Sequence, residues 1–209
     1  KIQRFVKYNR PGMAAVIAML LLIITVILNP KSLNINTLGS ILVQTMLLSF
    51  AAAGQTMVVI SGGVDLSVGS VMSMACIITT GIMQGQPGHF IPVLIAALSM
   101  GAAIGLLNGV CVVRVGLPPI VITLATSYVV TRLQYVFTGG MPTGLVSETF
   151  KRTVQYRLFG VIPGATMYAV VIWGLAFFLM HRSRFGKQLF LTGNNESAAR
   201  LNGVNTRRI

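Results

Sequence analysis

Side chains able to make and break bonds are scarce in this 209-residue sequence. It holds three carboxylates against 16 lysines and arginines, together with two histidines and two cysteines. His89 and His181 have no acid or cysteine at the spacing of a metal site, and Cys76 and Cys111 fall in apolar stretches, where a thiol behaves as a small hydrophobe. No GxxxxGK[ST] phosphate loop occurs. The residues therefore predict no catalytic site, no metal site and no cofactor of the chain's own.

Polar side chains instead follow one face of an apolar segment. They recur at the four- and seven-residue spacing of a helix face, and with one small residue they form the set Thr45, Ser49, Ala52 and Thr56. Gln44 and Gln55 flank this face. Lipid-facing surfaces avoid such residues, so two interpretations stay open: a helix–helix interface and a polar pathway for a hydrophilic solute. Ser70, Ser73 and Asn108 on later apolar segments join the candidate pathway residues.

The segment SGGVDLSVGS, residues 61–70, interrupts two apolar stretches. Its glycine pair breaks a helix, and Asp65 or Ser67 can cap the next helix by accepting backbone N–H groups. Asp65 is also the only acid among the first 147 residues. A broken helix at membrane depth often marks a transporter site, so Asp65 is either a cap or a pathway residue.

A stripe of small residues marks a later apolar segment. It consists of Ala97, Gly101, Gly105 and Gly109 at strict four-residue spacing. Such a stripe lets a neighbouring backbone approach closely, so helix packing is the favoured interpretation, and Asn108 beside it can bond across helices.

Composition and hydropathy predict the elements that carry these residues. Hydrophobic residues make up 54% of the chain and charged residues 9%, whereas soluble domains carry about 25% charged residues. A membrane-spanning helix needs about 20 apolar residues, and strand-like alternation is absent. The sequence predicts an all-α polytopic membrane protein with about six transmembrane helices, at Met13–Leu28, Ile41–Ile60, Val68–Met83, Ile91–Val113, Ile120–Phe137 and Pro163–Met180.

The basic residues predict the orientation of these helices. If both termini are cytoplasmic, eleven of the 16 cations lie inside, four lie outside, and Arg132 lies within a span. This is the asymmetry of the positive-inside rule, and the even number of helices agrees with it. The charge excess is therefore topological, which argues against nucleic acid as a partner.

Three stretches of the sequence resemble one known family. GQTMVVISGGVDLSVGS at residues 54–70, LNG followed by LPPIVITL at residues 107–124, and GNNESAARLNGVNTRRI at residues 193–209 are similar to the ribose-type sugar permeases of bacterial ABC importers. These permeases belong to a superfamily that also contains branched-chain amino acid permeases. Ser197 and Val204 depart from the residues commonest in the family's last motif.

The resemblance implies a single permease domain over residues 1–209, incomplete at its C-terminal end, in the bacterial inner membrane. Its implied partners are a second permease subunit, identical or different, cytoplasmic ATP-binding subunits that hold ATP and magnesium, and a periplasmic sugar-binding protein. The implied function is import of ribose or a related monosaccharide. The alternatives are a branched-chain amino acid permease and a membrane scaffold that transports nothing.

Within this resemblance, residues 193–209 correspond to the cytoplasmic loop that contacts the ATPase. The residues expected to couple are Glu196, Ala198, Ala199, Arg200, Leu201 and Gly203. They can form a short amphipathic helix, capped by Asn194 or Asn195 and ended by Gly203, whose small-residue face inserts into a groove of the partner. The competing interpretation is a juxtamembrane helix held by anionic membrane lipid.

Overall fold

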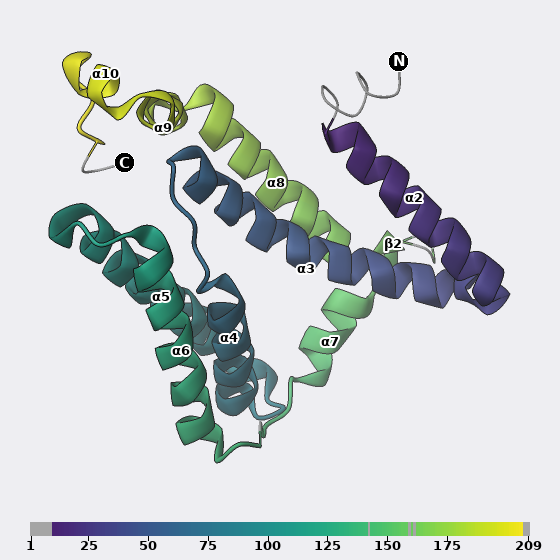
Figure 1. The fold of residues 1–209 in the computed structure, drawn as a ribbon. Helices are drawn as coiled ribbons and strands as arrows, with labels where there is room; N and C mark the ends of the chain where they lie inside the picture. Colours follow the sequence, from purple (N-terminus) through teal and green to yellow (C-terminus); the bar gives the residue numbers. More distant parts are fainter. Residues whose placement is uncertain (1–9, 142, 159, 161, 207–209) are drawn as a thin grey trace.

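A computed structural model describes residues 10–141, 143–158, 160 and 162–206. Helices dominate this part of the chain, and Figure 1 shows their arrangement. In chain order, the elements are α2 (Arg10–Leu28), η1 (Pro30–Leu33), α3 (Ile35–Ile60), α4 (Val68–Met83), η2 (Pro87–His89), α5 (Phe90–Val110), η3 (Cys111–Val115), α6 (Pro119–Thr138), α7 (Glu148–Gln155), β1 (Arg157–Leu158), β2 (Ile162–Pro163), α8 (Ala165–Arg182), α9 (Arg184–Asn194) and α10 (Glu196–Leu201).

Each of the six predicted spans has a helix in the structure, and the all-α prediction is confirmed. Four continuous helical stretches are long and apolar enough to cross a membrane, namely Ile35–Ile60, Pro87–Val115, Pro119–Thr138 and Ala165–Arg182. The apolar helices Gly12–Leu28 and Val68–Met83 are shorter. Which side of the membrane each end occupies stays a prediction.

The segment before α8 differs from the prediction. Pro163 does not open a helix: it lies in β2, which pairs antiparallel with β1 through Arg157 opposite Pro163. The helix begins at Ala165 instead, because Ile162 and Pro163 pair with Leu158 and Arg157. Helices α7 and α9 are strongly amphipathic and too short for a span, so a search for apolar stretches does not find them.

The helices pack as two groups. Helices α4, α5 and α6 lie side by side and form the α4–α6 body (Figure 1). Helix α3 packs against α8, while α9 contacts α8 and α3, and α10 packs on α9; these four form the α3–α8 body. The α3–α4 link, Ser61–Ser67, connects the two bodies, and α7 connects them a second time through its contacts with η2 and α8.

A line of buried hydrogen bonds holds the α4–α6 body together. The Thr126 hydroxyl on α6 donates to Asn108 Oδ1 on α5 at 2.7 Å, and Asn108 Nδ2 donates to Ser67 Oγ at 3.2 Å. Asn108 is 6% exposed and Ser67 is 1% exposed. On the same helices, Gln134 Nε2 donates to the Ser70 carbonyl at 2.8 Å. Polar side chains therefore join all three helices, as interhelical hydrogen bonds do in lipid-embedded proteins.

Most large apolar side chains point outward. Leu20, Leu98 and Phe177 are each more than half exposed, and the buried apolar residues of the described part are few. A water-soluble domain of this length would bury most such residues. The exposed apolar surface therefore fits a protein whose helices face lipid or further protein.

Removing one hydroxyl tests the buried line of hydrogen bonds. Thr126→Val nearly keeps the side-chain shape but leaves Asn108 Oδ1 without its donor. We expect the free energy of unfolding to fall by about 1 kcal/mol, the size of interhelical hydrogen bonds in membrane proteins. Thr131→Val is the matched control, because the Thr131 hydroxyl donates to the Ser127 carbonyl of its own helix. Thermal unfolding in detergent micelles compares them, and equal melting temperatures would contradict this role of Thr126.

Candidate functional site

A cavity of about 570 Å³ opens where the two bodies meet. The α3–α4 link, the end of α5, the start of α6 and the α9–α10 segment line it. Three groups of residues predicted from the sequence line it. Asp65 and Asn108 are candidate pathway residues, Gly105 and Gly109 belong to the small-residue stripe, and Glu196 and Arg200 belong to α10.

The α3–α4 link turns tightly because α3 ends in a Schellman motif. Gly62 N–H donates to the Val59 carbonyl and Gly63 N–H to the Val58 carbonyl, both at 3.0 Å. Gly62 has φ of +87°, a left-handed conformation that glycine adopts without a side-chain clash. The predicted helix break after Ile60 is therefore confirmed, and the Val58 and Val59 carbonyls near the end of α3 accept hydrogen bonds from the two glycines.

Asp65 closes a turn directly before α4. Its Oδ1 accepts the Ser67 N–H at 2.7 Å and the Ser67 hydroxyl at 2.6 Å. Ser67 occupies the N-cap position of α4, and its side chain makes no capping hydrogen bond to that helix. Asp65 thus bonds to the residue before α4, and the hydrogen bonds of Asp65 and Ser67 show no side-chain capping of an N–H within α4. Because Asp65 also lines the cavity, a pathway role stays a prediction.

Thr123 of α6 anchors the other end of the link. Its hydroxyl oxygen accepts the Leu66 N–H at 3.1 Å and lies 3.3 Å from the Val64 carbonyl. Thr123 and Thr126 are both buried, and Thr123 lines the cavity. Sequence reasoning did not select either threonine, because threonines on apolar helices most often bond to their own backbone.

Helix α10 has the predicted ends. Asn195 is its N-cap, and its Oδ1 accepts the Ala198 N–H at 3.0 Å. At the other end Gly203, with φ of +78°, completes a Schellman motif in which Gly203 N–H bonds to the Arg200 carbonyl and Val204 N–H to the Ala199 carbonyl. Asn194, the alternative cap, is the last residue of α9.

Charged groups of α10 are paired within the helix segment. Arg200 Nη2 lies 2.5 Å from Glu196 Oε1, and Arg200 Nε donates to the Thr206 hydroxyl, which in turn donates to Glu196 Oε1 at 3.1 Å. Hydrogen bonds from Arg200 and Thr206, together with the charge of the Arg200 guanidinium, hold the pKa of the Glu196 carboxyl below its usual value of 4.5. Arg200 therefore pairs with groups of its own segment.

The outer surface of α10 also differs from the expected small-residue face. Ala199 is 2% exposed and is buried together with Val204, so its methyl group packs within the chain. Ala198 is exposed, and Leu201 is 90% exposed. The residue that α10 offers most fully to a partner is thus Leu201.

The polar face of α3 lies away from the cavity. The hydroxyls of Thr45, Ser49 and Thr56 donate to carbonyls of their own helix, and Ser49 Oγ also accepts Trp173 Nε1 of α8 at 2.9 Å. The latter contact fits the helix-interface interpretation. Gln44 is exposed, whereas Gln55 Oε1 is buried without a hydrogen-bond partner.

The remaining candidate residues are two serines of α4 and the small-residue stripe of α5. Ser70 is buried and its hydroxyl donates to the Ser67 carbonyl, while Ser73 is exposed. At Gly101, Gly105 and Gly109 an added Cβ would meet no atom within 4 Å outside the neighbouring backbone, so no described element packs closely on this stripe. The predicted packing role of these three glycines has no partner within the described residues, whereas Ala97 is half-buried.

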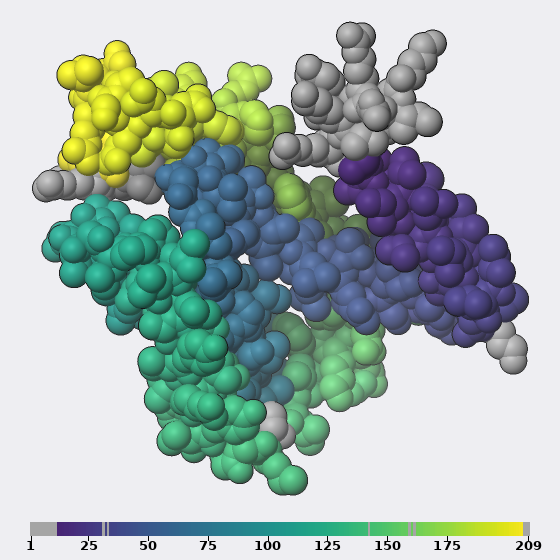
Figure 2. All heavy atoms as spheres, viewed as in Figure 1, coloured from purple at the N-terminus to yellow at the C-terminus, as the bar shows by residue number. Residues whose placement is uncertain are grey.

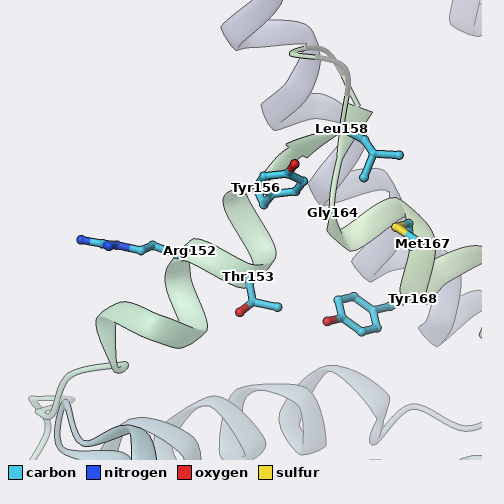
Figure 3. A pocket seen from close by; sticks show the side chains of 7 residues that line it. All are labelled: Arg152, Thr153, Tyr156, Leu158, Gly164, Met167 and Tyr168. Carbon is cyan, nitrogen blue, oxygen red and sulfur yellow. The ribbon is translucent and has the colours of Figure 1, made fainter.

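A second cavity of about 500 Å³ lies between α7 and the start of α8 (Figure 3). Tyr156, Thr153 and Tyr168 lie around a common space in that view, and Arg152 points away from it. The side chains lining it include no acid and no histidine. Across the described residues, no group of three His, Cys, Asp or Glu side chains is placed to hold a metal ion.

Comparison with known proteins identifies the family. Residues 37–209 match the family described as the permease component of the branched-chain amino acid transport system. No solved structure gives a significant match.

Curated relatives agree with the family match. The chain is 31% identical over 202 residues to the ribose import permease protein RbsC of Escherichia coli K12, covering 93% of this chain and 62% of the relative. It is 30% identical over 209 residues to the galactose/methyl galactoside import permease protein MglC of Haemophilus influenzae. That match covers 92% of this chain and 62% of the relative. It is also 30% identical over 207 residues to the autoinducer 2 import system permease protein LsrC of E. coli SMS-3-5. That match covers 99% of this chain and 60% of the relative.

The chain thus spans less than two thirds of the length of these relatives. The resemblance to sugar-type permeases is confirmed, and the family's members are transport subunits, not enzymes, in the bacterial inner membrane. On the family match over residues 37–209 and these identities, the chain belongs to the multi-pass ABC permease family of the branched-chain amino acid and sugar type.

Proposed function

We propose that this chain forms part of the translocation pathway of an ATP-driven importer for ribose or a related monosaccharide. The observation that carries the proposal is the shared cavity: the capped helix α10 borders the same space as Asp65 and Asn108. A docking element and a polar break in the membrane helices are thus neighbours. Relatives named for ribose and galactose support a sugar, and the family description keeps branched-chain amino acids as the second candidate.

In the proposed complex, α10 docks on a cytoplasmic ATP-binding subunit. The start of α2, the end of α3 and the α9–α10 segment lie toward one side of the helices, which agrees with cytoplasmic positions for all three (Figure 1). An exposed leucine on a short rigid helix suits an apolar groove of a partner. Because Glu196 and Arg200 already pair with each other, Leu201 carries the contact.

The other partners follow from the transport role. A periplasmic binding protein hands over the sugar, and a second permease subunit, identical or different, completes the pathway. The uncovered glycine stripe on α5 is a surface where further helices of the full protein or of the second subunit pack. ATP and magnesium are held by the ATP-binding subunits.

Uptake measurements test the transported molecule. Proteoliposomes with the full-length permease, its ATP-binding subunits and its binding protein should accumulate labelled ribose only with ATP inside. Unlabelled galactose should compete if the pathway accepts monosaccharides broadly, and leucine should not. Competition by leucine and none by sugars would establish the amino acid alternative and overturn the proposal.

Substitution of Leu201 tests the docking of α10. Leu201→Ala removes the apolar group that is 90% exposed and should weaken binding of the ATP-binding subunits about tenfold or more, as loss of a central interface anchor does. Asn205→Ala, an exposed change in the same segment, is the control. Copurification and a titrated binding assay give the comparison. If Leu201→Ala binds as tightly as the control, α10 does not dock through this residue.

Acid should loosen α10 through Glu196. Because the folded-state pKa lies below the usual 4.5, the ion pair contributes fully above pH 4.5, and its contribution is lost as the pH falls through the folded pKa. Hydrogen exchange of residues 196–204, compared with Glu196→Gln at each pH, should show extra protection at neutral pH that disappears under acid. Equal protection in both proteins at neutral pH would show that the pair does not stabilise α10.

A further inference from the structure

Close backbone contact joins α9 to the end of α3. An added Cβ on Gly193 would lie 1.7 Å from the Ile60 carbonyl oxygen, far inside van der Waals contact. At the preceding corner, an added Cβ on Gly186 would lie 2.0 Å from the Met180 carbonyl oxygen. Only glycine permits either approach, so α9 lies against α3 at one end and α8 at the other. Figure 2 shows the α9–α10 segment directly beside the end of α3.

No comparable close contact crosses the cavity among the described residues. Thr192, Glu196 and Arg200 line the α3–α8 side, while Asn108 and Thr123 line the α4–α6 side. Among the residues that the structure describes, the hydrogen bonds of α9 and α10 stay within their own segment, and those of Asn108 and Thr123 stay within the α4–α6 body and the link. The cavity thus separates two bodies that are each internally bonded.

Two segments connect the bodies, the α3–α4 link and α7, and only the link lines the cavity, so the pivot beside the cavity lies in the link. The Gly63 N–H still belongs to the cap of α3, through its bond to the Val58 carbonyl. Three residues later the Leu66 N–H is fixed to Thr123 of α6. Between these anchors only Gly63 lacks a side chain, so its ψ angle is the torsion least restricted by sterics.

We propose that Gly193 transmits displacement of α10 to the end of α3, and that the two bodies then pivot at Gly63 and change the width of the cavity between them. Gly193 and Gly63 are positioning residues, which act through α10 and the link. This inference rests on the proposed docking of α10. A rigid, close-packed contact transmits a small displacement, and hinge motion concentrates in a few residues of low steric restriction.

The first test separates docking from transmission. In Gly193→Ala the new methyl group forces α9 away from α3, while Leu201 remains available to dock. In the full importer in proteoliposomes, we expect the ATP-binding subunits to remain bound and ATP hydrolysis to continue. Sugar transported per ATP should fall about tenfold, within the usual range of coupling between sites. Gly54→Ala on α3 and Gly174→Ala on α8 are matched controls, because an added Cβ there meets nothing within 4 Å.

A second variant keeps the proposal testable if Gly193→Ala does not assemble. In Gly63→Ala the new methyl group would lie 3.2 Å from Val58 Cγ1, which a small side-chain shift relieves, but the backbone loses torsional freedom. We expect assembly and docking as in the unsubstituted importer and a lower ratio of sugar transported to ATP hydrolysed. An unchanged ratio in Gly63→Ala would overturn the pivot.

Spin-label distances report the motion directly. With Cys76 and Cys111 replaced, a label pair on Val171 of α8 and Tyr128 of α6 should change distance when ATP binds, because the pair joins the two bodies. A pair on Leu98 of α5 and Tyr128, within one body, should keep its distance. Gly193→Ala and Gly63→Ala should each reduce the change between the bodies.

The outcomes distinguish the two proposals. If the unsubstituted importer binds no ATP-binding subunit through α10, the proposed function fails before the pivot is tested. If it docks and transports, but both glycine variants keep normal coupling and the full distance change, only the pivot is wrong. An equal distance change within the α4–α6 body would also contradict it.

Discussion

A directional line of hydrogen bonds, from Thr126 through Asn108 and Ser67 to Asp65, is the interaction on which this structure depends. Each hydroxyl or amide donates to the next group, and the line ends on a carboxylate, the strongest acceptor available. A break in a membrane helix exposes backbone groups that lipid cannot satisfy. Here the line anchors the chain where α3 ends and α4 begins, and it ties that point to α5 and α6.

With the start of α4 anchored to α5 and α6, two further contacts determine where the cavity lies. The Schellman motif of α3 directs the chain away from its helix axis, and Thr123 fixes the returning backbone at Leu66. The cavity is the space left between this anchored body and the α9–α10 segment packed on the end of α3. The α3–α4 link and α10 therefore lie on the same cavity because the hydrogen-bond line fixes the link and the Gly193 contact fixes the α9–α10 segment.

Local features of this site were predictable from sequence, and long-range ones were not. The apolar runs predicted six helices, and Asn195 and Gly203 predicted the ends of α10, because hydropathy and capping depend on neighbouring residues. The inward position of Ala199 and the contact of Gly193 with Ile60 depend on how distant segments meet. Gly193 is followed by two asparagines, a sequence context that predicts a turn although α9 continues through it, so the sequence contains no signal of that contact.

The three acids of the chain show how few charges a membrane permease uses for structure. Glu148 pairs loosely with Arg152 on an exposed helix, with 3.6 Å between Glu148 Oε1 and Arg152 Nε, a contact that contributes little. Glu196 and Asp65 instead each accept two hydrogen bonds, Glu196 in the α10 segment and Asp65 in the α3–α4 link, and both line the same cavity. Asp65 holds the Ser67 backbone N–H at one wall of the cavity, and Glu196 joins the side chains of Arg200 and Thr206 at the other, so the shape of the site depends on both acids.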